Sequence, residues 1–208
     1  MRASSGTDYC AGSMTHDPPA PRGRVADRGH RRLGIDETAT LDRDAFVASF
    51  GGVFEDSPWI AARAWDRGPF ASVAELHAAM VAVVDAAPGE ARAALIRAHP
   101  ELAGKAAIAG TLTPESTREQ AAAGLDRLTP EQHARILALT ASYRERFGFP
   151  FVVCAREHDA DSIIATAAAR LAHDPDEEER AALAEIAKIA ALRLDDLVAD
   201  DVPGGTSA

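Results

Sequence analysis

The sequence predicts an all-α protein, a single-domain helical bundle of about eight to nine helices. From Leu41 onward, apolar residues recur at helical spacing almost without a break, a pattern typical of amphipathic helices. Proline, glycine and capping residues repeatedly divide these periodic stretches. Because the connections between them are short and the chain has 208 residues, we expect one helical domain.

Caps, prolines and glycines place the helices in chain order. Most of the periodic stretches begin beside a Ser, Thr or Asp cap, or at a proline. These signals predict helices over residues 42–50, 58–65, 72–87, 90–99, 113–124, 129–147, 160–173 and 175–198. Residues 149–155 are short, apolar and contain a proline, and no partner strand is evident, so we expect a buried extended connector there.

The chain is expected to divide into a tail, a domain and a second tail. Residues 1–38 cluster Pro, Gly, Ser and Arg and lack apolar periodicity. Such a composition predicts a disordered N-terminal extension, in which Met14 is an alternative start. We expect the helical domain over residues 39–200 and a flexible tail over residues 201–208.

Composition and charge narrow the function classes. The net charge is −10, and the first 35 residues carry six Arg and three Asp, so the remainder carries −13 and is a poor candidate for nucleic-acid binding. No apolar run reaches the length of a membrane span, and Arg outnumbers Lys 20 to 2, so we expect a soluble, cytoplasmic protein. Of the two cysteines, Cys154 follows apolar residues and is predicted to be an inert buried thiol. Metal-ligand and phosphate-loop motifs are missing from the sequence.

Two polar residues twenty positions apart, His99 and Glu119, are candidates for proton transfer. Pro100 disfavours helical geometry at His99, which places the imidazole at a helix end. There it is alternatively only a cation that stabilises the helix C-terminus. Glu119 follows Ser116 at capping-box spacing, so a structural cap is the alternative for this pair. Catalysis and capping both stay open at this point.

Arg193 lies on the apolar face of the last predicted helix. At 100° per residue it stands within about 40° of three apolar side chains, those of Ile186, Ile189 and Leu197. A buried guanidinium must be paired or face a cavity, because leaving it unpaired costs several kcal/mol. Two interpretations follow: an internal salt bridge, with Glu119 as a candidate partner, or a clamp for a carboxylate or urea-like ligand.

Motifs spread along the chain resemble those of the OHCU decarboxylases, which act on 2-oxo-4-hydroxy-4-carboxy-5-ureidoimidazoline (OHCU). The motifs are His-Pro-Glu-Leu-Ala-Gly at 99–104, Gly-Thr-Leu-Thr-Pro-Glu-Ser at 110–116 with Glu-Gln at 119–120, the run at 143–151, and Leu-Arg-Leu at 192–194. Their order is that of the family. The resemblance covers about residues 41–198 and leaves only the tails outside.

The resemblance implies a helical fold, a homodimer, and an enzyme without a metal or organic cofactor. It implies that His99 and Glu119 are catalytic. It also implies a substrate site bordered by Pro100, Ser116, Gln120, Phe151, Val153, Ala155 and Arg193. The activity implied is decarboxylation of OHCU to (S)-allantoin in purine and urate degradation. The substrate's own ring C=N accepts the electron pair left by CO2, so a cofactor is not needed as an electron sink.

Two other functions remain open from the sequence. The chain could be a non-enzymatic helical interaction module in which His99 and Glu119 are only caps. It could also be another cofactor-free enzyme of ureide metabolism, such as a ring hydrolase. Product analysis separates these alternatives, because only the decarboxylase releases CO2 as allantoin forms.

Overall fold

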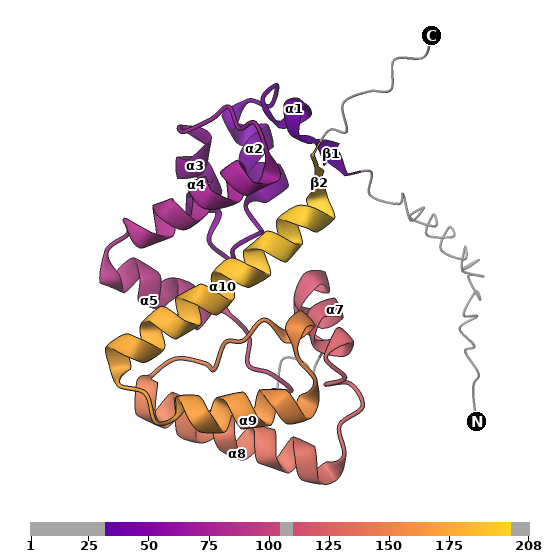
Figure 1. The fold of residues 1–208 in the computed structure, drawn as a ribbon, viewed down its shortest axis with the longest axis vertical. Helices are drawn as coiled ribbons and strands as arrows, with labels where there is room; N and C mark the ends of the chain where they lie inside the picture. Colours follow the sequence, from indigo (N-terminus) through magenta and orange to yellow (C-terminus); the bar gives the residue numbers. More distant parts are fainter. Residues whose placement is uncertain (1–31, 105–109, 201–208) are drawn as a thin grey trace, which may run out of the picture.

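The computed structural model describes residues 32–104 and 110–200, and most of these residues are helical (Figure 1). The prediction of an all-α protein is confirmed for this part of the chain. Its elements are β1 (Leu33–Gly34), α1 (Ile35–Thr38), α2 (Arg43–Phe50), α3 (Pro58–Trp65), α4 (Val73–Asp85), α5 (Gly89–Ala98), α7 (Pro114–Ala122), α8 (Pro130–Phe147), the 3-10 helix η1 (Ala155–Glu157), α9 (Ala160–Arg170), α10 (Pro175–Leu197) and β2 (Val198–Ala199).

The helices begin where side chains satisfy free backbone N–H groups. The side chains of Thr113, Thr129 and Asp174 each accept a hydrogen bond from a backbone N–H three residues further on. A proline follows each of these caps at the first helical position, where its missing N–H costs nothing. Gly148 ends α8 with a left-handed φ of 75°, a conformation that glycine adopts without strain. These are the boundaries that the sequence predicts.

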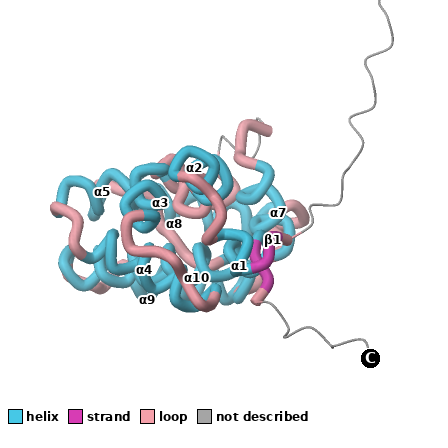
Figure 2. Tube along the Cα trace, turned by 90° about the horizontal axis from the view of Figure 1, so that it is seen from above, coloured by secondary structure: helices cyan, strands magenta, loops and turns pink. Residues whose placement is uncertain are grey.

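The long helix α10 crosses the middle of the molecule and organises the fold. In Figure 1, α1 to α4 lie on one side of it, and α7, α8 and α9 lie on the other. It packs directly against α4 and α5, while α8 packs against α9 and α7 lies against η1. Seen from above in Figure 2, β1 lies at one edge of the helical body beside α1.

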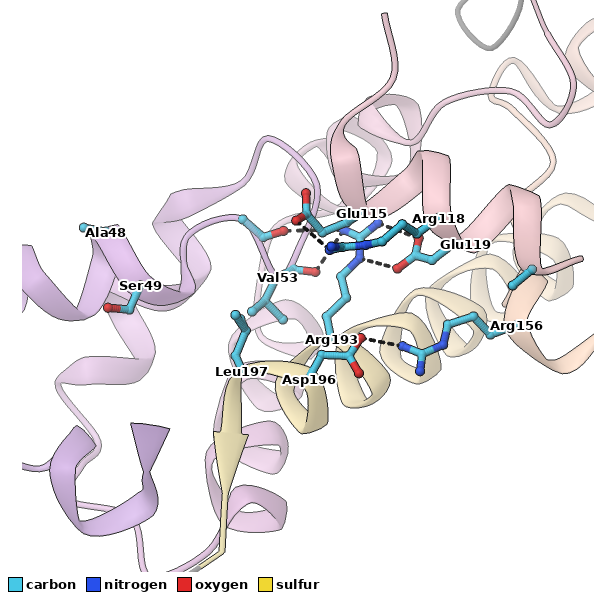
Figure 3. Close-up of a pocket in the computed structure, with 12 residues that line it drawn as sticks. Ala48, Ser49, Val53, Glu115, Arg118, Glu119, Arg156, Arg193, Asp196 and Leu197 are labelled. Atoms are coloured by element: carbon cyan, nitrogen blue, oxygen red, sulfur yellow. Dashed lines mark hydrogen bonds and ion pairs between the residues drawn. The ribbon is translucent and has the colours of Figure 1, made fainter. Parts of the chain in front are cut away.

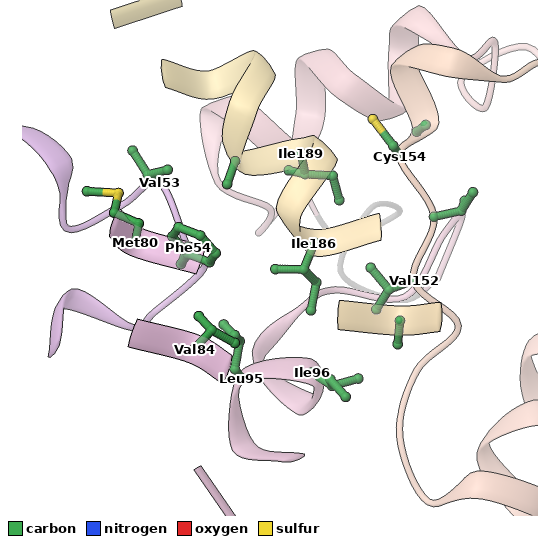
Figure 4. Packing of buried hydrophobic residues seen from close by; sticks show 14 of the residues in the cluster. Val53, Phe54, Met80, Val84, Leu95, Ile96, Val152, Cys154, Ile186 and Ile189 are labelled. Atoms are coloured by element: carbon green, nitrogen blue, oxygen red, sulfur yellow. The ribbon is translucent and has the colours of Figure 1, made fainter. Parts of the chain in front are cut away.

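The apolar core forms on both sides of α10. Figure 4 shows Ile186 and Ile189 of this helix between Val53 and Phe54 on one side and Val152 on the other. All five side chains are buried. A fully buried aliphatic or aromatic side chain of this size contributes about 1.5–3 kcal/mol, so α10 unites the two halves mainly through apolar burial.

Six residues assigned by the sequence to the N-terminal extension form regular secondary structure. Residues 33–38, which the sequence assigns to the disordered extension, form β1 and α1. Leu33 and Gly34 pair in parallel with Val198 and Ala199, and the Arg32 guanidinium donates two hydrogen bonds to the carbonyl of Val198. Two-residue strands joined across the whole chain have no periodic signature, which is why the sequence does not reveal them. The remaining tail residues, 1–31 and 201–208, lie outside the described residues.

The predicted connector is extended and buried, as expected. Residues 149–154 lack regular secondary structure, and η1 begins at Ala155. Arg170 of α9 holds the connector, because its Nη1 donates to the carbonyl of Val152 at 2.8 Å and its guanidinium lies over the Phe151 ring. Among the described residues, no helix is long and apolar enough to span a membrane.

Candidate active site

A small cavity of about 30 Å³ lies where the end of α5, helix α7, the connector and α10 meet. All nine site residues predicted from the sequence line it: His99, Pro100, Ser116, Glu119, Gln120, Phe151, Val153, Ala155 and Arg193. Leu102, Val152 and Ile189, which the sequence did not single out as site residues, complete the wall. The volume matches about one water molecule. The fold therefore brings four distant segments of sequence together around one small cavity.

His99, which lines this cavity, has one ring nitrogen without a hydrogen-bond partner among the described residues. The residue ends α5 in an extended conformation, with φ −70° and ψ 136°, as the following Pro100 requires. Its Nδ1 lies 3.0 Å from the carbonyl oxygen of Leu95. Because a carbonyl can only accept, Nδ1 carries the hydrogen and Nε2 keeps its lone pair. Nε2 is buried and has no hydrogen-bond partner among the described residues.

The imidazole of His99 is neutral near pH 7. Burial, the largest effect, lowers the pKa of His99, and the positive charge of Arg193 lowers it further, outweighing the opposing effects of Leu95, Glu55 and Glu119. A neutral imidazole does not stabilise a helix C-terminus by its charge, although its Nδ1–H still satisfies the Leu95 carbonyl in the last turn of α5. The same imidazole can accept a proton at Nε2.

Arg193 forms the internal salt bridge that the helical pattern suggests. Its Nε and Nη2 donate to the two carboxylate oxygens of Glu119 at 2.7 and 2.8 Å. Figure 3 shows the side chain extending from α10 toward Glu119 on α7 and the carbonyl of Val53. Nη1 donates at 2.6 Å to Glu55 and at 3.4 Å to the carbonyls of Gly52 and Val53. With a further bond from Nη2 to Ser116 at 3.3 Å, all five N–H donors are used.

Ser116 and Glu119 are not the cap of α7. Thr113 is the residue whose side chain accepts from the backbone N–H of Ser116, so the helix starts three residues before the alternative cap. The Ser116 hydroxyl instead donates to Glu55 at 3.0 Å. Both polar side chains of the supposed capping box therefore contact Arg193 and its neighbours.

Glu55 is a buried acidic residue that sequence reasoning missed. It lies in the loop between α2 and α3, and its side chain is 5% exposed. Burial alone would raise the pKa of this carboxyl, but the Arg193 guanidinium beside it holds the pKa below its usual range. The only sequence signal for its burial is weak, since Glu55 directly follows the apolar pair Val53-Phe54.

Gln120 fixes the loop that follows Pro100. Its side-chain oxygen accepts a hydrogen bond from the backbone N–H of Ala103 at 3.1 Å. Ala103 has a φ of 49°, in the left-handed region that alanine rarely adopts. The hydrogen bond from Gln120 helps to stabilise this strained turn, which leads away from His99.

Cys154 has the inert character that its sequence context predicts. Its side chain is buried, and burial raises the pKa of the thiol to about 11, with the nearby Glu157 and Glu185 adding to the effect. Hardly any thiolate exists near pH 7, so this residue is unsuited to nucleophilic attack. Within residues 32–104 and 110–200, no group of three or more His, Cys, Asp or Glu is arranged to hold a metal ion.

A second, larger cavity of about 440 Å³ lies beside the Arg193–Glu119 pair. Figure 3 shows its lining, which includes Arg118 on α7 and the ion pair between Arg156 and Asp196. Arg193 and Glu119 line both cavities. We call the smaller one the inner cavity and the larger one the outer cavity.

Comparison with known proteins identifies the family. A family model described as OHCU decarboxylase matches residues 39–195. The chain belongs to this family. All nine predicted site residues of this OHCU decarboxylase family member fall inside the matched region.

Curated relatives and solved structures agree with this assignment. A mouse 2-oxo-4-hydroxy-4-carboxy-5-ureidoimidazoline decarboxylase is 43% identical over 76% of this chain and 89% of its own length. The relative of the same name from Haloferax volcanii is 42% identical over 78% of this chain and 94% of its own length. A crystal structure of (S)-allantoin synthase has a TM-score of 0.64 at 24% identity. The match covers 80% of this chain and about half of the synthase chain. A crystal structure of OHCU decarboxylase in the presence of (S)-allantoin has a TM-score of 0.57 at 21% identity. The match covers 70% of this chain and 94% of that chain. At these identities the two structures show the fold alone.

Proposed function

We propose that this chain decarboxylates OHCU to (S)-allantoin. Membership of the OHCU decarboxylase family supports the reaction. The observation that carries the proposal is the unpartnered Nε2 of His99, a buried neutral base on a residue that lines the same cavity as Glu119 and Arg193. An interaction module has no use for such a group, because a buried nitrogen without a partner costs stability.

The chemistry asks the protein for orientation and proton transfer. The bond between C4 and the carboxylate breaks, and its electron pair forms a double bond to C5, the ring carbon that carries the ureido group. The former C=N pair moves to the ring nitrogen, which takes up a proton. The enol then loses its hydroxyl proton and gains a proton at C5. The sum is loss of CO2 and gain of one proton.

Three side chains divide this work. His99 acts on the hydroxyl and carboxylate side, where its free Nε2 accepts the hydroxyl proton. Arg193 holds the anionic, urea-like substrate, since its planar guanidinium forms paired hydrogen bonds. Glu119 hydrogen-bonds the ureido or ring nitrogens of the substrate. Pro100, Gln120 and the connector shape the surrounding wall.

Substrate entry requires the Arg193–Glu119 pair to open. The inner cavity holds about 30 Å³, far less than the substrate needs, and every N–H of Arg193 is already engaged. Glu119 is the partner free to move, because its side chain is 14% exposed and faces both cavities. Once released, its carboxylate accepts hydrogen bonds from the N–H groups of the ligand, while Arg193 takes up the ligand's carboxylate.

The decisive experiment supplies OHCU freshly generated by urate oxidation. CO2 release and the circular dichroism of the (S)-allantoin formed are followed with and without the protein. Chiral allantoin should form rapidly with the protein, whereas slow racemic product in both samples would refute the proposal. Ring opening without CO2 would indicate a hydrolase instead.

We also propose that the protein is a cytoplasmic homodimer. The homodimer is an implication of the family resemblance, and the location rests on the composition of the chain. Light scattering should give twice the mass of the 208-residue chain, and fractionation should recover the protein with cytoplasmic enzymes. A monomeric mass at micromolar concentration would contradict the first part.

A further inference from the structure

Glu55 contacts three polar side chains at the site, although the sequence did not single it out. Its Oε2 accepts from Arg193 Nη1 at 2.6 Å. Its Oε1 accepts from the hydroxyls of Ser116 at 3.0 Å and Thr113 at 3.2 Å. One carboxylate in the loop between α2 and α3 therefore joins α10 to the first turn of α7, the helix that carries Glu119.

The two carboxylates that bind Arg193 differ in their surroundings. Glu119 lines the inner and outer cavities, where a ligand would enter. Glu55 does not line either of them and, like Arg193, is 5% exposed. The backbone carbonyls of Gly52 and Val53 lie beside the same Nη1. Gly52 and Val53 line the outer cavity, so of the Nη1 contacts only the one with Glu55 lies away from both cavities, whereas the Nε contact with Glu119 faces them.

From this division we infer that Glu55 is a positioning residue for the decarboxylation, which anchors the Arg193 guanidinium when Glu119 releases it to the substrate. The inference rests on the proposed function of the site. Glu55 does not reach the reacting atoms and acts through Arg193 and α7.

Charge explains why a second carboxylate is useful. With Glu55 present, Arg193 divides its hydrogen bonds between two anions, so the pair with Glu119 is weaker than an exclusive one. Without the charge of Glu55, Arg193 and Glu119 would form a self-sufficient pair that a ligand opens less readily. Glu55 also keeps the guanidinium aimed at the cavity during the exchange, and a misplacement of about 1 Å can cost about a hundredfold in rate.

The backbone beside Glu55 supports a dedicated role. Asp56 has a φ of 42°, in the left-handed region that is uncommon for residues other than glycine. Strained backbone of this kind persists where surrounding contacts hold it, and it concentrates at functional sites. At this turn two consecutive acidic residues have opposite surroundings, since Glu55 is buried and Asp56 is exposed.

The test replaces Glu55 by Gln, which keeps the shape and removes the charge, and by Asp, which keeps the charge. Glu179→Gln is the matched control, because Glu179 pairs with Arg92 at 2.9 Å outside both cavities. Turnover of fresh OHCU, calorimetric binding of (S)-allantoin and thermal unfolding are measured for each. For Glu55→Gln we expect kcat/KM and allantoin affinity to fall about tenfold to a hundredfold, while Glu179→Gln stays at the wild-type level.

A pH profile separates positioning from mere packing. Glu55 raises the pKa of His99 through its negative charge. The charged groups facing His99 are Glu55, Glu119 and Arg193. Glu55→Gln should therefore shift the acidic limb of kcat/KM to lower pH, and Glu55→Asp should restore it. Wild-type kinetics and an unmoved limb in Glu55→Gln would overturn the inference. Unfolding of both Glu55 variants would overturn it too, since the role would then be structural. Inactivity of the unaltered chain would instead refute the proposed function.

Discussion

The buried ion pair between Arg170 and Glu178 allows a stability prediction worked from the structure. Their side chains are 8% and 0% exposed. Glu178 accepts from Nε and Nη2 of Arg170 and lies 2.8 Å from Nδ1 of His173. Glu178→Ala removes all of these contacts at once. It leaves the Arg170 guanidinium buried with only the Val152 carbonyl and the Tyr143 hydroxyl as partners.

The expected loss in free energy of unfolding is large. Removing one partner of a buried pair costs about 3–5 kcal/mol, because the remaining charge is uncompensated. In a domain of this size each kcal/mol lowers Tm by about 2–4 °C, so Glu178→Ala should lower Tm by roughly 6–20 °C. Glu179→Ala is the control one residue away. Its pair with Arg92 is 29% and 31% exposed and should contribute at most about 1 kcal/mol.

Thermal unfolding followed by far-UV circular dichroism at a fixed protein concentration measures both variants. Near-equal Tm values for Glu178→Ala and Glu179→Ala would refute the reasoning that burial determines how much an ion pair contributes to the stability of this fold. A second readout is activity per folded molecule well below Tm. It should fall in Glu178→Ala, because Arg170 also holds the connector that borders the inner cavity.

Four further outcomes are expected. His99→Gln should lower kcat by about a hundredfold to ten-thousandfold, the usual contribution of a general base, with Tm nearly unchanged, and near-normal production of chiral allantoin would refute the role of His99. Wild-type activity should decline as pH falls through the pKa of His99, which burial holds below the ordinary 6.5; a decline centred above 6.5 would contradict this. Over the same range the free energy of unfolding should also decrease. Below pH 6.5 His99 binds a proton in the unfolded chain, whereas its lowered pKa keeps it unprotonated in the folded chain. Cys154 should resist thiol reagents at pH 7 until the chain unfolds, and rapid labelling of the folded protein would contradict its raised pKa.

The sequence reveals most of the fold because the helix boundaries are local. Thr113 and Thr129, each followed by proline, predict the starts of α7 and α8 within one residue. Pairing between β1 and β2 is different, since it joins residues 165 positions apart through two-residue strands. Neither strand is long enough to show a period, so only the folded chain can reveal it.

The candidate site residues follow from two kinds of sequence signal. Helix-end signals single out His99 and Glu119, the helical pattern singles out Arg193, and the family motifs include all three. Neither kind of signal points to Glu55. It lies in a loop, where periodicity carries no information, and its partner Arg193 is 138 residues away. A loop carboxylate is usually exposed, and only the structure shows that this one is buried.

The pattern of an arginine on the apolar face of a helix, which singled out Arg193, also applies to Arg170. It predicts that an arginine is paired but not whether it belongs to a ligand site. Arg170 shares the buried face of α9 with Ile163 and Ala167, just as Arg193 shares that of α10 with Ile186. Both arginines are therefore expected to be paired, and both are. What separates them is the surrounding space. Arg170 lines neither of the two cavities that Arg193 lines, and His99, with its unpartnered nitrogen, lines the smaller of these two. A buried charge predicts pairing, but only an adjacent cavity with an unsatisfied polar atom makes that pair a candidate for exchange with a ligand.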